Sequence, residues 1–169
     1  MSYSNYQSNK GRYDQNRSQN GRGGKSYDAN RESVFETITP VRQPLSREYG
    51  SKPEIFLEGQ VLYETAQQII KLKTHQVRKV LSVTKEALAT ARSGKDFSQA
   101  RMKLFTLLPM MAYNTGRAPA KERSSYEKLL GFVYKNVNQE SISKPEDIEM
   151  FDQMVTAVVA YHKFLGGKD

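Results

Sequence analysis

The chain of 169 residues contains no cysteine and only two histidines, His75 and His162. Without cysteine it cannot form a disulfide framework, a thiolate nucleophile or a cysteine-based zinc or iron–sulfur site. The two histidines have no neighbours at metal-ligand spacing, and the sequence lacks a P-loop, a dinucleotide fingerprint and paired catalytic carboxylates. These absences predict a protein that is not an enzyme, with no catalytic residue, no metal site and no cofactor.

Long apolar runs are also missing. No stretch of consecutive apolar residues is long enough to span a bilayer, and the N-terminal segment MSYSNYQSNKGR has no apolar signal-peptide region. We therefore expect a soluble protein that is neither anchored in a membrane nor secreted. The absence of cysteine is consistent with a cytoplasmic protein, because the cytoplasm is reducing.

The N-terminal part is poor in aliphatic side chains and rich in Ser, Asn, Gln, Gly, Tyr and Arg. Such a segment cannot bury enough apolar surface to offset its ordering entropy. Its arginines, scattered among tyrosines, resemble weak RNA-binding tails, and a solubilising leader without a target fits equally well. Three prolines, Pro40, Pro44 and Pro53, favour an extended linker after it. The sequence thus predicts a disordered tail with a linker over residues 1–53 and a folded domain over 54–169.

Helical periodicity begins after Pro53 and continues to the end of the chain. The predicted helices cover about 54–71, 74–92, 96–116, a fourth from between 119 and 125 to about 137, and 145–166. Thr74 and Asp96 are expected as N-caps, and Gly116 as the end of the third helix. Pro109 predicts a kink in that helix, because proline lacks an N–H and crowds the carbonyl of Phe105. The predicted fold is all-α, a compact five-helix bundle preceded by a disordered N-terminal tail.

The formal net charge of +8 favours a polyanionic partner, with nucleic acid ahead of an acidic membrane surface. In the second predicted helix, Arg78, Lys85 and Arg92 lie seven residues apart, a spacing that places them in one column along the helix. Arg101 and Lys103 add charge on the third helix, whereas the fifth begins with several acids. We expect a basic side that can follow a phosphate backbone, and an acidic end. A solvated helix face is the other interpretation.

Three blocks of the sequence resemble a known family. They are LKTHQVRKVL at residues 72–81, AY followed by GR at 112–117, and FDQM leading to AVVAYHKF at 151–164. In this order and at these separations they are similar to the small subunit of type III-A CRISPR effector complexes, the Csm family. The resemblance covers roughly residues 54–166.

The resemblance implies a non-catalytic, all-helical subunit of an antiviral ribonucleoprotein. Such subunits occur in several copies and line the channel that holds guide RNA paired with target RNA. The implied partners are the guide RNA and target RNA, the repeating backbone subunit, the large subunit and neighbouring copies of the small subunit itself. Because base pairing reads the sequence in a guided complex, such a subunit needs only to recognise the sugar–phosphate backbone.

The predicted RNA-binding residues come from two sources. The positions that match the family's motifs are Arg78, Lys79 and Arg117, and the positions added from the distribution of charge are Lys85, Arg101, Lys103 and Lys121. Arg117 can also act as a cation at the negative end of a helix dipole, and both roles stay open. Tyr113 is expected in the core. Two other functions remain as alternatives: a free-standing helical adapter that docks an acidic protein, and a small ribonuclease that uses His75 and His162.

Overall fold

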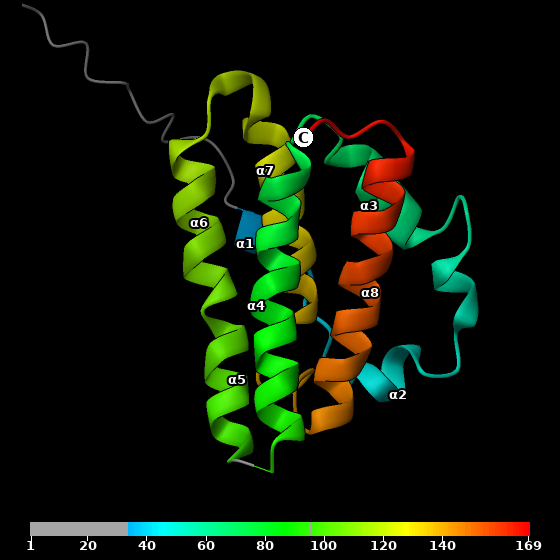
Figure 1. Ribbon diagram of the computed structural model, residues 1–169, viewed down its shortest axis with the longest axis vertical. Helices are drawn as coiled ribbons and strands as arrows, with labels where there is room; N and C mark the ends of the chain where they lie inside the picture. The colour runs from blue at the N-terminus through cyan, green and yellow to red at the C-terminus, as the bar shows by residue number, and fades with distance from the viewer. Residues whose placement is uncertain (1–33, 95) are drawn as a thin grey trace, which may run out of the picture. The chain divides into compact units, whose positions relative to one another are not determined.

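The computed structural model describes residues 34–94 and 96–169, which belong to one compact unit. Over these residues it contains helices and turns but no strand. In chain order the helices are α1 (Val34–Thr37), α2 (Leu45–Tyr49), the 3-10 helix η1 (Pro53–Phe56), α3 (Val61–Gln68), α4 (Thr74–Arg92), α5 (Phe97–Phe105), α6 (Leu107–Arg117), α7 (Ala120–Asn136) and α8 (Pro145–Phe164) (Figure 1). The all-α prediction is confirmed. The predicted disorder before residue 34 lies outside the described residues.

Helix α4 packs on both α5 and α8 and lies between them (Figure 1). The third helix, α3, packs on α8 and α7, and α6 packs on α7. The face of α4 that carries Val77, Val80 and Leu88 is buried, as the three-and-four spacing of its apolar residues predicts. Within the described part of the chain, no helix is long and apolar enough to cross a membrane.

The expected number of five helices is wrong, because two predicted helices are divided. The third predicted helix, 96–116, is interrupted at Thr106, between α5 and α6. Pro109 explains the interruption, since it has no N–H to donate to the carbonyl of Phe105, four residues earlier. The predicted kink is therefore a break. The first predicted helix is likewise divided, into η1 and α3. A turn at Gly59 separates them, and its φ of 77° is a conformation that glycine adopts readily.

The segment from 34 to 53 differs from the extended linker that its prolines favour. It contains α1 and α2, and Val41, Leu45 and Tyr49 are buried in the core. The backbone N–H of Val41 donates to the carbonyl of Lys135 at 2.8 Å, and that of Leu45 to the carbonyl of Ser141 at 2.9 Å. Proline also precedes or begins short helices, as at Pro44 and Pro53 here. The packed region thus begins before residue 54.

Most helix ends follow their sequence signals. Asp96 caps α5, because its carboxylate accepts the backbone N–H of Ser98 at 2.9 Å. Gly94 and Gly166 have positive φ values of 71° and 92°, and they follow the ends of α4 and α8, where glycine commonly ends a helix. Gly116 does not end its helix: it lies within α6, which continues to Arg117. Likewise Thr74 is the first residue of α4 and not its cap.

Candidate nucleic-acid interface

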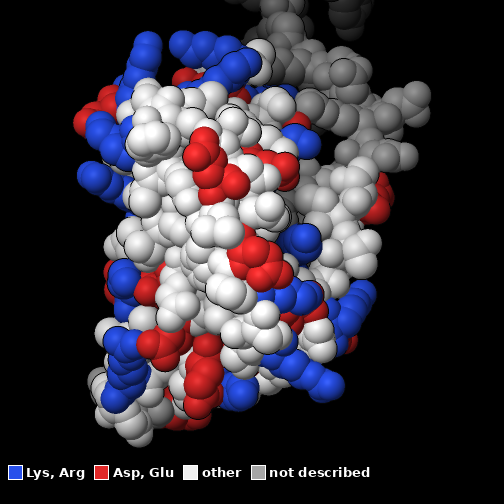
Figure 2. Space-filling view, turned by 90° about the vertical axis from the view of Figure 1, so that its right-hand side faces the viewer, with Lys and Arg blue, Asp and Glu red and all other residues white. Residues whose placement is uncertain are grey.

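The basic column of α4 faces the acidic beginning of α8. Nζ of Lys85 lies 2.7 Å from Oδ2 of Asp152, and Nη2 of Arg92 lies 2.6 Å from Oε1 of Glu149. Figure 2, which views the molecule from the side of α8 and α2, shows acidic and basic side chains interspersed over its lower half. The predicted basic side and acidic end therefore partly neutralise each other.

The two cations of α5 also have partners within the protein. Nζ of Lys103 lies 3.7 Å from Oε2 of Glu86 on α4. The guanidinium of Arg101 lies over the rings of Phe97 and Phe105, at 5.9 and 5.4 Å from their centroids. It also donates to the carbonyl of Gln139 at 3.4 Å. Arg101 and Lys103 thus connect α5 with its surroundings.

At the opposite end of the described structure, α4 and α7 begin and α6 and α8 end (Figure 1). Cations without carboxylate partners gather there. Here Lys71, Lys73, Lys121 and Lys168 line an open hollow of about 740 Å³. Among the described residues, none of these four lysines forms an ion pair with a carboxylate. We call these lysines, together with Arg78, Lys79 and Arg117, the basic end.

Two carboxylates reach this hollow, from Glu122 and Asp169. Oδ2 of Asp169 lies 2.7 Å from Nζ of Lys163, and this hydrogen bond lowers the pKa of the Asp169 carboxyl. The positive charge of Arg78 lowers the pKa of Asp169 further. Asp169 is therefore engaged with Lys163, and lysines dominate the rim.

Buried contacts hold the C-terminal segment against the start of α4. The backbone N–H of Thr74 donates to the carbonyl of Lys168 at 2.6 Å, and the Thr74 hydroxyl donates to the carbonyl of Gly167 at 3.3 Å. Nε2 of the buried His162 lies 3.0 Å from the carbonyl oxygen of Leu72. Burial lowers the pKa of His162, which favours the neutral ring. These contacts bring Lys168 to the hollow that Lys73 lines.

A second hollow adjoins the first, because Glu122 lines both. At its edge, Nη1 of Arg117 donates to the hydroxyl of Tyr113 at 2.6 Å, and the guanidinium lies 5.3 Å from the ring centroid. Tyr113 is 60% exposed, so the expectation of a core tyrosine is wrong. Tyr113 and Arg117 are four residues apart, so they share one face of α6, and both side chains are exposed there.

The lysines of α7 form a column that the sequence interpretation missed. Lys121, Lys128 and Lys135 lie seven residues apart, so they project from α7 in nearly the same direction. Within the described residues, none of them forms an ion pair. The same spacing rule that singled out Arg78, Lys85 and Arg92 on α4 finds this α7 lysine column. By contrast, Lys71, Lys73 and Lys168 precede or follow helices, and only the tertiary structure joins them.

Of the seven predicted RNA-binding residues, four belong to the basic end and three do not. Arg78 and Lys79 are exposed on the first two turns of α4, and Arg117 and Lys121 lie where α6 ends and α7 begins. The other three, which have protein partners elsewhere, are Lys85, Arg101 and Lys103. Among the described residues, no group of three His, Cys, Asp or Glu side chains could hold a metal ion.

Comparison with known proteins gives one result. A protein-family model described as Csm2 Type III-A matches residues 58–168, which is more than half of the chain and includes every cation of the basic end. No curated protein and no solved structure matches the chain.

Proposed function

This chain belongs to the Csm2 family of type III-A CRISPR complexes, and we propose from this premise that it is a non-catalytic RNA-binding subunit of such a complex. It holds RNA by the sugar–phosphate backbone, through the basic end and the α7 lysine column. The observation that supports this is the gathering of lysines without carboxylate partners at one end of the described structure. Cations that already neutralise a carboxylate contribute less to a phosphate site.

Backbone recognition follows from the chemistry of these groups. Each lysine that neutralises a phosphate releases counterions, which gives affinity without reading bases. Along α7 the column from Lys121 to Lys135 extends over about 21 Å, at 1.5 Å per residue. In a guided complex this is sufficient, because guide and target find each other by base pairing.

The partners in this proposal are those of the assembly. The basic end lines the channel for guide RNA and target RNA, while the rest of the surface meets the repeating backbone subunit, the large subunit and neighbouring copies of the chain. The complex works in the cytoplasm. A free-standing adapter that docks an acidic protein through the same basic end is the second candidate, because lysines attract carboxylates as well as phosphates.

We test the proposal by comparing two triple variants, one in the basic end and one outside it. The first changes Lys71, Lys73 and Lys121 to Gln, and the control changes Arg42, Lys103 and Lys144, which are exposed cations outside the basic end. We expect the first variant to weaken binding of an RNA duplex at least tenfold and to reduce the slope of log K against log salt by about two to three. The control retains most of the wild-type affinity and slope.

The outcomes separate the candidates. Equal losses in the two triple variants would refute the assignment to the basic end. Wild-type protein that retains no RNA at low salt, yet binds an acidic protein, would favour the adapter. Sequence-selective or salt-insensitive RNA binding would contradict recognition of the backbone.

A further inference from the structure

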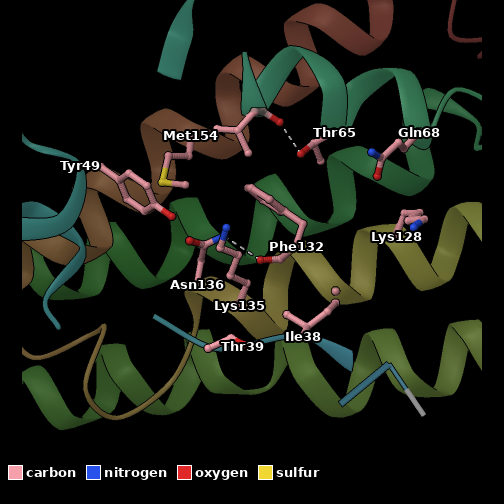
Figure 3. A pocket seen from close by; sticks show the side chains of 12 residues that line it. Ile38, Thr39, Tyr49, Thr65, Gln68, Lys128, Phe132, Lys135, Asn136 and Met154 are labelled. Carbon is pink, nitrogen blue, oxygen red and sulfur yellow. Dashed lines mark hydrogen bonds between the residues drawn. The ribbon is translucent and has the colours of Figure 1, made fainter. Parts of the chain in front are cut away.

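A separate hollow of about 370 Å³ lies between α3 and α7 (Figure 3). Phe132 and Met154, both nearly fully buried, contribute its apolar part, and Lys128 and Lys135 of the α7 lysine column line it as well. Tyr49 comes from α2, which packs on α8. The N–H of Leu45 in α2 donates to the carbonyl of Ser141, and the N–H of Val41, just before α2, donates to that of Lys135 near the end of α7. The walls are therefore built by elements that pack firmly.

Asn136, the last residue of α7, gives this hollow an unusual polar group. The side chain is only 2% exposed, and its Nδ2 donates to the carbonyl of Phe132 at 2.8 Å. Its Oδ1 is buried and accepts no hydrogen bond. Figure 3 shows this amide at the same end of the hollow as the hydroxyl of Tyr49. Buried acceptors are nearly always paired in folded proteins, so an unpaired one that lines a hollow is available to a donor that enters the hollow.

The remaining walls suit a flat ring. Phe132 stacks on Phe151, with centroids 5.9 Å apart and planes at 21°, and this contact holds the ring in place. The thioether of Met154 adds a polarisable surface that packs well against aromatic rings. Lys128 is exposed and Lys135 half-buried, so the cationic groups lie toward solvent while the acceptor lies inside.

We propose that this hollow binds one nucleotide, with the base inside and the 5′-phosphate outside. The base lies against Phe132 and Met154, an N–H on its edge donates to Oδ1 of Asn136, and the phosphate meets Lys128 or Lys135. The same chemistry has two sources: a free mononucleotide, or an unpaired nucleotide of RNA that follows the α7 lysine column. The second source rests on the proposed function, whereas the first does not.

The test uses the full chain and three probes. AMP carries both the phosphate and an amino donor, N6,N6-dimethyl-AMP lacks that donor, and ribose 5-phosphate lacks the base. By titration calorimetry we expect AMP to bind at least tenfold more tightly than ribose 5-phosphate, and at least fivefold more tightly than the dimethyl compound. The comparison among probes needs no variant, so it holds even if a substitution disturbs folding.

Variants then assign the contacts. Asn136→Leu keeps a similar volume and removes the unpaired acceptor, so it should abolish the preference for AMP over the dimethyl compound without weakening ribose 5-phosphate. Changing Lys128 and Lys135 to Gln should weaken AMP and ribose 5-phosphate alike. Lys144→Gln, at an exposed lysine before α8, is the matched control and should leave both affinities unchanged.

Two results decide the matter. If AMP binds no better than ribose 5-phosphate, or if the preference for AMP over the dimethyl compound persists in Asn136→Leu, the nucleotide site is overturned, and salt-dependent RNA binding can still stand. If AMP binds as expected but RNA does not bind at low salt, the site holds with a free mononucleotide as its ligand, and the proposed function fails instead.

Discussion

Lys85 on α4 and Asp152 on α8 form an ion pair, with Nζ of the lysine 2.7 Å from Oδ2 of the aspartate. The Asp152 side chain is only 9% exposed, whereas that of Lys85 is 55% exposed. The lysine thus covers a carboxylate that has little access to water. This contact turns a residue that the sequence predicts as an RNA ligand into a connection between two helices.

For Lys85→Gln we expect the free energy of unfolding to fall by about 1–3 kcal/mol, because the Asp152 carboxylate loses its charged donor. RNA affinity should stay at the wild-type level. Urea denaturation and RNA titration at fixed salt measure the two quantities. Lys103→Gln is the control: its partner Glu86 is exposed and 3.7 Å away, so the loss should be below about 1 kcal/mol. Weaker RNA binding with unchanged stability would argue for a direct contact of Lys85 with RNA.

Asp147 connects α2 with the start of α8. Its carboxylate accepts the backbone N–H groups of Ser46, Ser143 and Lys144 at 2.9, 2.9 and 3.0 Å. Burial by itself raises the pKa of this carboxyl, but these hydrogen bonds outweigh burial and lower the pKa below 3.8. In Asp147→Asn an amide N–H replaces one acceptor. We therefore expect the free energy of unfolding at pH 7, measured by urea denaturation, to fall by about 1–2 kcal/mol.

The pH dependence of Asp147 has a definite sign. As the pH falls, the unfolded chain binds the proton first, because its pKa is the higher one. The contribution of Asp147 is therefore fully present above pH 3.8 and is lost as the pH falls through the lower folded pKa. Wild type and Asp147→Asn should thus differ less in stability at pH 2.5 than at pH 7. An equal difference at both values would contradict the assignment.

His162 gives a second pH dependence, at higher pH. Burial lowers its pKa below 6.5, and Nδ1 is buried without a hydrogen-bond partner. The unfolded chain therefore binds the proton before the folded one does, so stability falls as the pH drops from 6.5 towards the folded pKa. We expect the free energy of unfolding of the wild type to fall between pH 7.5 and 5.5. In His162→Gln the decline should be smaller; an identical decline would assign it to other groups.

Arg117→Gln separates the two roles left open for this arginine. Because Arg117 and Tyr113 are both exposed, we expect the free energy of unfolding to change by less than about 1 kcal/mol. RNA affinity should fall, with a smaller dependence on salt, if the guanidinium contacts phosphate. Thermal unfolding and RNA titration measure the pair of effects. A loss of stability with unchanged RNA binding would identify a helix-end cation instead.

Two glycine substitutions test the packing of the C-terminal segment. A Cβ at Gly167 would collide with the imidazole of His162 and lie 2.7 Å from its carbonyl oxygen, so Gly167→Ala should lower the melting temperature. A Cβ at Gly116 meets nothing within 4 Å, so Gly116→Ala should add up to about 1 kcal/mol through helix propensity. If both variants behaved alike, the segment would not be held as described.

The sequence predicts the long helices well, because their signals are local. Apolar spacing and end signals place α4, α7 and α8 close to their observed bounds. The sequence does not predict the short helices α1 and α2, since four or five residues near prolines show no helical period. Their positions depend on packing against α7 and α8, which are distant in the chain.

In the candidate site, too, some residues are predictable from local spacing, whereas others depend on how the helices pack. Arg117 and Lys121 stand out in the sequence beside a helix boundary, and Lys128 and Lys135 could have been found from their spacing. Nothing near Lys85 in the sequence shows that Asp152 lies opposite, because that depends on how α8 packs on α4.

By itself the sequence determined that the chain is helical, has an excess of positive charge and carries acids at the start of its last helix, since these properties depend on residue type and short-range spacing. Only the tertiary structure decided which cations remain free. Whether a lysine meets a carboxylate or water depends on the helix packed beside it, and that neighbour is set by the burial of apolar faces far apart in the chain.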